Sequence, residues 1–163
     1  MALAAILAAL YGSYVLVFGF ISFGPLQFRL VDALIPLSIV LGPAGIVGVT
    51  LGCFIGNALG PNLGVIDIIG GPAANLLAAT LAYLITRKQF RGSWILAVSV
   101  EIAVIAAIVG TYVVVLTGVP FLVNWLQILA SEIVIIGVVG YPLLKAVHRA
   151  TARGPGLETK IPS

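Results

Sequence analysis

Long apolar segments alternate with short polar breaks along the whole chain. The apolar segments cover about residues 2–21, 30–41, 44–58, 66–86, 93–117 and 122–147. A helix needs roughly 20 apolar residues to cross the hydrocarbon core of a bilayer, and most of these segments approach that length. The short second segment ends at Gly42-Pro43, a pair that stops helices. The pattern therefore predicts an all-α integral membrane protein with six transmembrane helices.

Composition supports this class. Of the 163 residues, 61% are hydrophobic and only 8% are charged, and the mean hydropathy is +1.24. Soluble domains carry about a quarter charged residues. Six spans leave no room for a separate soluble domain, so we expect one membrane domain over residues 1–148. Residues 149–163 are polar and contain a Gly-Pro-Gly turn, which predicts a disordered cytoplasmic tail.

The positions of the basic residues predict an orientation. Six spans place both termini on one side, together with the basic turn at residues 87–91 and the cations of the C-terminal segment. Cytoplasmic loops are enriched in Lys and Arg, so we expect cytoplasmic termini and an external loop at residues 22–29. Arg29 is the basic residue of that external side. The cations are scattered at helix ends and form no clustered basic face, which argues against nucleic-acid binding.

Several chemistries lack their residues. One cysteine and one histidine permit neither an internal disulfide nor a Cys/His metal cluster, so we predict no metal and no cofactor. No phosphate-binding loop is present, so the chain cannot drive ATP-dependent transport alone. Hydrolase and metalloprotease motifs are also absent, and the sequence does not predict an enzyme.

Two acidic residues lie deep in predicted membrane helices. Glu101 is about 12 Å from the start of the fifth helix, and Glu132 about 15 Å from the start of the sixth, at 1.5 Å per residue. A charge near the membrane midplane costs about 3 kcal/mol, so such residues usually face an interior and serve function. The alternative is that the two acids form structural hydrogen bonds with each other.

Other polar residues form stripes on the predicted helices. Asp67, Gly71 and Asn75 follow one side of the fourth helix, and Glu101 aligns with Tyr112 on the fifth. Asp32 and Asp67 lie at helix starts, where capping is the alternative explanation. We predict that the stripes line one substrate site beneath the external loop. Its residues would be Gln27, Arg29, Asp32, Asn57, Asp67, Asn75, Glu101, Tyr112, Asn124, Gln127 and Glu132.

Small residues recur every fourth position in the first helix. Ala4, Ala8 and Gly12 form one series, and Ala5, Ala9 and Ser13 form a second beside it. Small side chains on one face allow another helix to approach closely. The partner could be a helix of this chain or of another protein. The glycines of the third helix, at residues 45, 48, 52 and 56, most simply serve an internal contact.

Three segments together resemble a known family. Residues 23–34 (FGPLQFRLVDAL), 52–57 (GCFIGN) and 64–71 (GVIDIIGG) are similar to the queuosine-precursor transporter (QueT) family, and the similarity extends over about residues 2–148. Its members are substrate-binding S components of energy-coupling factor (ECF) transporters. The sequence departs from the family pattern at Val31-Asp32, where a Ser-Glu pair is expected.

The resemblance implies a six-helix S-component fold and an outward-facing site for a 7-deazaguanine such as queuine or its aminomethyl precursor. It also implies docking onto a transmembrane coupling subunit that carries two ATPases, through Ala4, Ala8 and Gly12. One alternative is an S component for another vitamin or small nutrient. An alternative of another class is a self-sufficient channel or proton-coupled carrier that uses Glu101 and Glu132. A purely structural membrane subunit is a third.

Overall fold

The structure is a computed structural model that describes residues 1–19, 28–60, 63–88 and 90–152, and every regular element in these ranges is a helix. In chain order the elements are α1 (Ala2–Val17), the 3₁₀ helix η1 (Leu30–Leu37), α3 (Ser38–Leu41), α4 (Pro43–Leu59), α5 (Val65–Thr86), α6 (Ser93–Thr117), α7 (Phe121–Glu132), the π-helix η2 (Ile133–Gly140) and α8 (Tyr141–Ala152). This confirms the predicted all-α class.

The helices follow the predicted apolar segments. The predicted segment 93–117 coincides with α6, and α7, η2 and α8 form one helical stretch, Phe121–Ala152. In the described part of the chain, α5, α6 and Phe121–Ala152 are long and apolar enough to cross a membrane. Three shorter apolar helices, Ala2–Val17, Leu30–Leu41 and Pro43–Leu59, complete the set. Six crossings therefore stay a prediction. The helix α8 continues past residue 149 to Ala152, beyond the predicted start of the polar tail.

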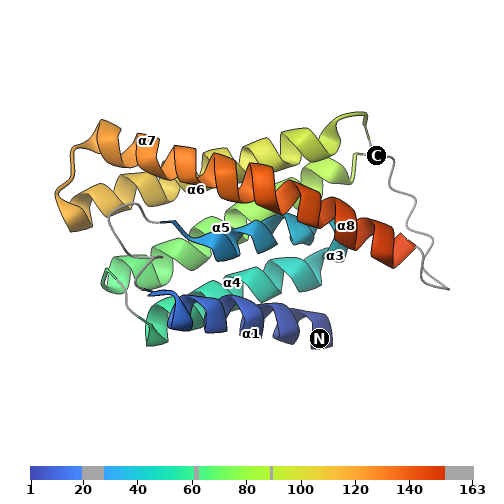
Figure 1. Cartoon of the computed structure of the whole chain (residues 1–163), viewed down its shortest axis with the longest axis horizontal. Coiled ribbons are helices and arrows are strands. Elements are labelled where there is room, and N and C mark those ends of the chain that lie inside the picture. Colours follow the sequence, from blue (N-terminus) through green and yellow to red (C-terminus); the bar gives the residue numbers. More distant parts are fainter. Residues whose placement is uncertain (20–27, 61–62, 89, 153–163) are drawn as a thin grey trace.

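The helices form an elongated bundle with two distinct ends (Figure 1). The start of α1, the α5–α6 turn and the end of α8 lie at one end, and the α6–α7 turn lies at the other. The first end carries the basic residues of the α5–α6 turn and Arg149 of the last turn of α8. We call it the basic end, and we call the other the loop end.

The short second segment is not an α-helix for most of its length. Leu30–Leu37 is a 3₁₀ helix, and only Ser38–Leu41 is α-helical. Pro36 lies inside η1, and its ring removes a backbone donor and disfavours the α conformation of the residue before it. Gly42, with φ +59°, ends α3, and Pro43 takes the first position of α4, where its missing N–H costs little.

Glycines bring α1 and α4 into close contact. A Cβ added at Gly52 would lie 2.5 Å from Cβ of Tyr11 and 2.8 Å from the carbonyl oxygen of Ala8. A Cβ at Gly56 would lie 2.6 Å from Cβ of Val15. Glycine therefore lets the two backbones approach where any side chain would separate them. This is the internal contact predicted for the glycine-rich segment.

The same contact accounts for one of the two small-residue series. Ala4, Ala8 and Gly12 are buried. The carbonyl oxygens of Ala4 and Ala8 lie 3.0 and 2.8 Å from where the Cβ atoms of Gly48 and Gly52 would be. These three residues therefore pack against a helix of the same chain, as in the internal alternative. This corrects the expectation that they form the docking surface for a partner protein. The second series, Ala5, Ala9 and Ser13, has exposed side chains.

Candidate ligand-binding site

A buried ion pair connects the loop before η1 to α5. Nη2 of Arg29 lies 3.4 Å from both Oδ1 and Oδ2 of Asp67, and both side chains are buried. Arg29 precedes η1, and Asp67 belongs to the first turn of α5. The Tyr112 hydroxyl of α6 donates to Oδ1 of Asp67 at 2.8 Å, and Nδ2 of Asn57 in α4 donates to the Asp67 carbonyl oxygen at 2.9 Å. Asp67 therefore ties together four parts of the bundle.

A second hydrogen-bonded chain starts from α1. The Tyr11 hydroxyl donates to Oδ1 of Asp32 in η1, and it accepts a hydrogen bond from Nδ2 of Asn75 in α5 at 3.1 Å. All three side chains are buried. Sequence reasoning missed Tyr11, because α1 was considered only for its small residues. The available signal was a phenol four residues from both Leu7 and Val15, on the helix face that carries Ala4 and Ala8.

The carboxylates of Asp32 and Asp67 thus make tertiary contacts. Neither η1 nor α5 has a side-chain hydrogen bond at its N-cap. The hydrogen bonds that these carboxylates accept come from Tyr11, Arg29 and Tyr112. The capping alternative therefore does not account for either residue, although both remain in first turns where the helix dipole favours an acid.

A small cavity lies between these two networks. Its polar lining comes from Arg29, Asp32, Asn75 and Glu132, and Gly71 exposes its backbone to it. Apolar side chains of α6 and α7 close the rest: Ile105, Val109 and Ile128. The volume is about 10 Å³, which is room for about one water molecule.

Glycine at position 71 lets the polar groups come together. A Cβ there would lie 2.8 Å from Nδ2 of Asn57 and 3.5 Å from Nη1 of Arg29. The first of these distances is too short for any carbon–nitrogen contact, so a side chain would displace the amide. Gly70 plays the same part for Tyr112, whose Cε1 would be 2.9 Å from a Cβ at that position.

Of the two acidic residues that line this cavity, Glu132 has a carboxyl oxygen that accepts no hydrogen bond from the described residues. It is buried, and its Oε2 has no hydrogen-bond partner among the described residues. It is also the last residue of α7, directly before the π-helix η2. A π-helical segment within a longer helix often marks a functional site, because it changes the direction of the side chains around it.

The structure gathers most of the predicted site residues but not all of them. Arg29, Asp32, Asn75 and Glu132 line the cavity, while Asp67, Tyr112 and Asn57 belong to the adjoining network. Gln27 lies outside the described residues. Among the described residues of this site, three carboxyl groups, of Asp32, Asp67 and Glu132, lie around one guanidinium, that of Arg29.

Glu101, Asn124 and Gln127 stand apart from the cavity. Glu101 is fully buried one helical turn beyond Ile105, and neither of its oxygens has a hydrogen-bond partner in the described ranges. The alternative of a direct hydrogen bond between Glu101 and Glu132 is therefore not seen. Nδ2 of Asn124 donates to the Gly110 carbonyl oxygen at 2.9 Å and so fastens α7 to α6. Gln127 is half-buried and does not line the cavity.

Comparison with known proteins identifies a transport family that the chain matches. A family model described as QueT transporter matches residues 1–149. The matched range contains every residue of the candidate site. Of the helices in the described part of the chain, only the last three residues of α8 lie beyond it. Comparisons with curated proteins and with solved structures gave no match.

Proposed function

Because the chain belongs to the QueT transporter family, we propose that it is the substrate-binding S component of an ECF importer for a queuosine precursor. Family membership makes it a membrane transport protein and not an enzyme, and the long apolar helices agree with a membrane location. The proposal adds the class of importer, the substrate, the site and the partners.

The observation that carries the proposal is the charge balance of the buried cluster. Two carboxyl groups, of Asp32 and Glu132, and the guanidinium of Arg29 line one cavity, a third carboxyl group, of Asp67, pairs with Arg29 beside it, and Oε2 of Glu132 has no partner among the described residues. A 7-deazaguanine presents adjacent N–H donors, for which a carboxylate is a bidentate acceptor. An aminomethyl substituent adds a cation, which favours a further carboxylate. We assign Asp32 and Glu132 to these two tasks.

Binding such a ligand requires the cavity to open. Its volume of about 10 Å³ is far below what a bicyclic ring occupies. The parts that can separate are η1, which carries Asp32, and the α7–η2 junction, which carries Glu132. The helices η1 and η2 pack against each other at the far end of η2, since a Cβ at Gly140 would lie 3.0 Å from the Ala33 carbonyl oxygen. We propose that the ligand enters between them from the loop end.

The orientation and the partners follow in the same proposal. The basic end faces the cytoplasm by the positive-inside rule, so the loop end and the cavity face outside. The coupling subunit and its two ATPases then supply the energy for uptake. We place the contact on the outer face of α1, where Ala5, Ala9 and Ser13 are exposed. Small exposed side chains allow a partner helix to approach closely.

Calorimetry on the purified chain tests the ligand. We expect queuine or 7-aminomethyl-7-deazaguanine to bind. Vitamins that are not related to guanine, such as thiamine or biotin, should give no measurable heat of binding. Binding of a vitamin instead would keep the S-component class and change the substrate. No detectable affinity for any of these compounds would contradict the assignment.

Flux measurements separate the S component from a self-sufficient carrier. Liposomes that hold this chain alone should not accumulate the ligand, because turnover needs the coupling subunit and ATP hydrolysis. Co-reconstitution with a coupling subunit and its ATPases should give ATP-dependent uptake. Uptake by the chain alone, abolished by Glu101→Gln, would instead support the proton-coupled carrier.

A further inference from the structure

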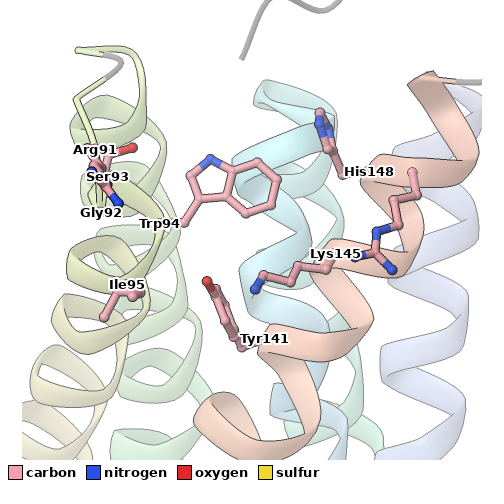
Figure 2. Close-up of a pocket in the computed structure, with 9 residues that line it drawn as sticks. Arg91, Gly92, Ser93, Trp94, Ile95, Tyr141, Lys145 and His148 are labelled. Atoms are coloured by element: carbon pink, nitrogen blue, oxygen red, sulfur yellow. The ribbon is translucent and has the colours of Figure 1, made fainter. Parts of the chain in front are cut away.

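A second and larger cavity lies at the basic end, away from the candidate ligand site. It has a volume of about 390 Å³ and is enclosed by the start of α6 and by α8 (Figure 2). The α6 side contributes Arg91, Gly92, Ser93 and Trp94, and the α8 side contributes Tyr141, Lys145 and His148 with Arg149. None of these residues belongs to the network around Arg29 and Asp67.

The lining of this cavity is positive. Arg91, Lys145 and Arg149 contribute three cations, and among the described residues no acid lines the cavity. Within the described ranges none of the three forms an ion pair, since the ion pair found there joins Arg29 and Asp67. Like charges around one cavity repel one another, and an anion bound between them would offset this repulsion. The arrangement therefore favours a negatively charged ligand.

Hydrogen-bond donors point to the same kind of ligand. Trp94 is only 6% exposed, yet its Nε1 has no hydrogen-bond partner in the described part of the chain. Figure 2 shows its indole extending from α6 into the space toward His148, and the two rings meet edge to face with centroids 5.0 Å apart. Nδ1 of His148 is also buried and unpartnered among the described residues. A buried indole N–H without a partner among the described residues, and an imidazole beside it, thus belong to the lining of a cavity that also contains cations.

The start of α6 adds a further attraction. Gly92 has φ +86° and is the N-cap of α6, a helix of 25 residues, so the N-terminal end of this helix lies at the cavity wall. The helix dipole places partial positive charge at this point. From the other side, Nζ of Lys145 lies 4.4 Å from the centre of the Tyr141 ring. Figure 2 shows that the amine extends from α8 toward that ring and into the space.

The apolar surroundings indicate a lipid. Ile95 lines the cavity and is 61% exposed, and the neighbouring Leu96 is 47% exposed. Trp and Tyr are the residues that concentrate at the membrane–water boundary. A ligand that fits both halves has an anionic head for the cations and acyl chains for the outer surface of α6. Basic pockets between membrane helices bind phospholipid headgroups by this combination.

We propose that this cavity binds the phosphate headgroup of an anionic phospholipid from the leaflet at the basic end. Arg91 and Lys145 contact the phosphate, the indole N–H of Trp94 donates to one of its oxygens, and the acyl chains lie along Ile95 and Leu96. The proposal requires only that the chain is embedded in a bilayer. It does not depend on the identity of the transported compound.

Native mass spectrometry of the full chain in detergent tests this site. The lipids are phosphatidylglycerol and phosphatidylcholine, which share acyl chains and differ in net charge. We expect phosphatidylglycerol to be retained and phosphatidylcholine to be lost. The double substitution Arg91→Gln/Lys145→Gln should weaken phosphatidylglycerol binding at least about tenfold, because each surface cation contributes to the attraction. Trp94→Phe keeps the ring, removes the donor and should weaken binding several-fold.

The matched control removes one Arg and one Lys at the same end of the bundle. Arg87→Gln/Lys88→Gln changes the net charge equally, but neither residue lines the cavity. This variant should retain the lipid within about twofold, because screened cations outside the site add little. Equal losses in the two double variants would show a diffuse attraction and overturn the proposal. Binding of inorganic phosphate or glycerol phosphate as tight as that of the lipid would also overturn it, in favour of a site for a free phosphate.

Discussion

Tyr11 and Asp32, 21 residues apart in the chain, are joined by a buried hydrogen bond from the phenol to Oδ1 of the carboxylate. The phenol also accepts a hydrogen bond from Nδ2 of Asn75. One hydroxyl therefore links α1 to η1 and α5. Because the opposite face of α1 carries the exposed small residues, Tyr11 connects the proposed partner surface with the proposed ligand site.

Replacing Tyr11 with Phe should destabilise the protein and weaken ligand binding. The substitution keeps the ring but leaves a buried carboxylate and a buried amide without this partner, at a cost of about 1–3 kcal/mol. Thermal unfolding in detergent should show a lower midpoint, and calorimetry should show lower affinity. Tyr14→Phe, on the same helix with a half-buried ring, is the control and should change neither. Equal behaviour of the two variants would remove Tyr11 from the site.

Neutralising Asp67 should be more damaging than neutralising Glu101. Asp67→Asn removes the negative charge that faces the buried guanidinium of Arg29, and breaking a buried pair in this way costs about 3 kcal/mol or more. Glu101→Gln removes a fully buried acid that faces no cation among the described residues and has only the Ser38 hydroxyl as a neighbouring polar side chain, so stability should stay the same or rise. Chemical or thermal unfolding of both variants measures the difference. Similar losses would indicate that Glu101 has a partner of equal importance.

Glu132 should control selectivity for a cationic ligand. Glu132→Gln keeps the shape of the side chain and removes its charge, so affinity for 7-aminomethyl-7-deazaguanine should fall about tenfold or more, as for a hydrogen bond to a charged group. Affinity for 7-deazaguanine, which lacks the aminomethyl group, should change little. Calorimetry with both compounds measures the ratio. If Glu132→Ala and Arg29→Ala both bound normally, the site itself would be wrongly placed.

Enlarging Gly52 should separate α1 from α4. The new methyl group of Gly52→Ala would lie 2.5 Å from Cβ of Tyr11 and 3.0 Å from Cα of Ala8, so the helices must move apart. Overpacking of this kind typically costs about 1–3 kcal/mol. Gly137→Ala is the control, because its nearest neighbour would be Cδ1 of Ile102 at an ordinary 3.7 Å. A lower unfolding midpoint is expected for the first variant alone, together with weaker ligand binding through Tyr11.

The positions of the helices could be predicted because membrane helices follow length and apolarity. The segment 93–117 is predicted to the residue, since a basic turn and Gly118 bound it. The 3₁₀ and π segments could not be predicted, because both read as ordinary apolar helix. Pro36 gives a local reason for the first. The π-helix η2 has no such local reason. It ends at Gly140, which packs against η1, and a tertiary contact of this kind cannot be read from the sequence.

The clustering of the polar side chains was predictable in part, and the site itself stays a prediction. Helical periodicity placed Asp67, Gly71 and Asn75 on one face, and the structure buries all three. The same periodicity aligned Glu101 with Tyr112, but alignment does not fix depth, and Glu101 lies one turn beyond the cavity. The two small-residue series of α1 differ by one position, or 100°, and only the location of α4 decides which one is buried.

The 3₁₀ helix also sets how deep the ligand must travel. Eight 3₁₀ residues and four α residues extend the segment Leu30–Leu41 to about 22 Å, whereas twelve α residues would span about 18 Å. The hydrocarbon core is about 30 Å thick. In the proposed orientation, with this segment along the membrane normal and the turn at Gly42 at one membrane boundary, Arg29 would lie about 8 Å below the opposite boundary. A substrate of the proposed importer would therefore lose most of its hydration before it met the carboxylates, which would make their hydrogen bonds stronger and a poorly matched ligand costlier to admit.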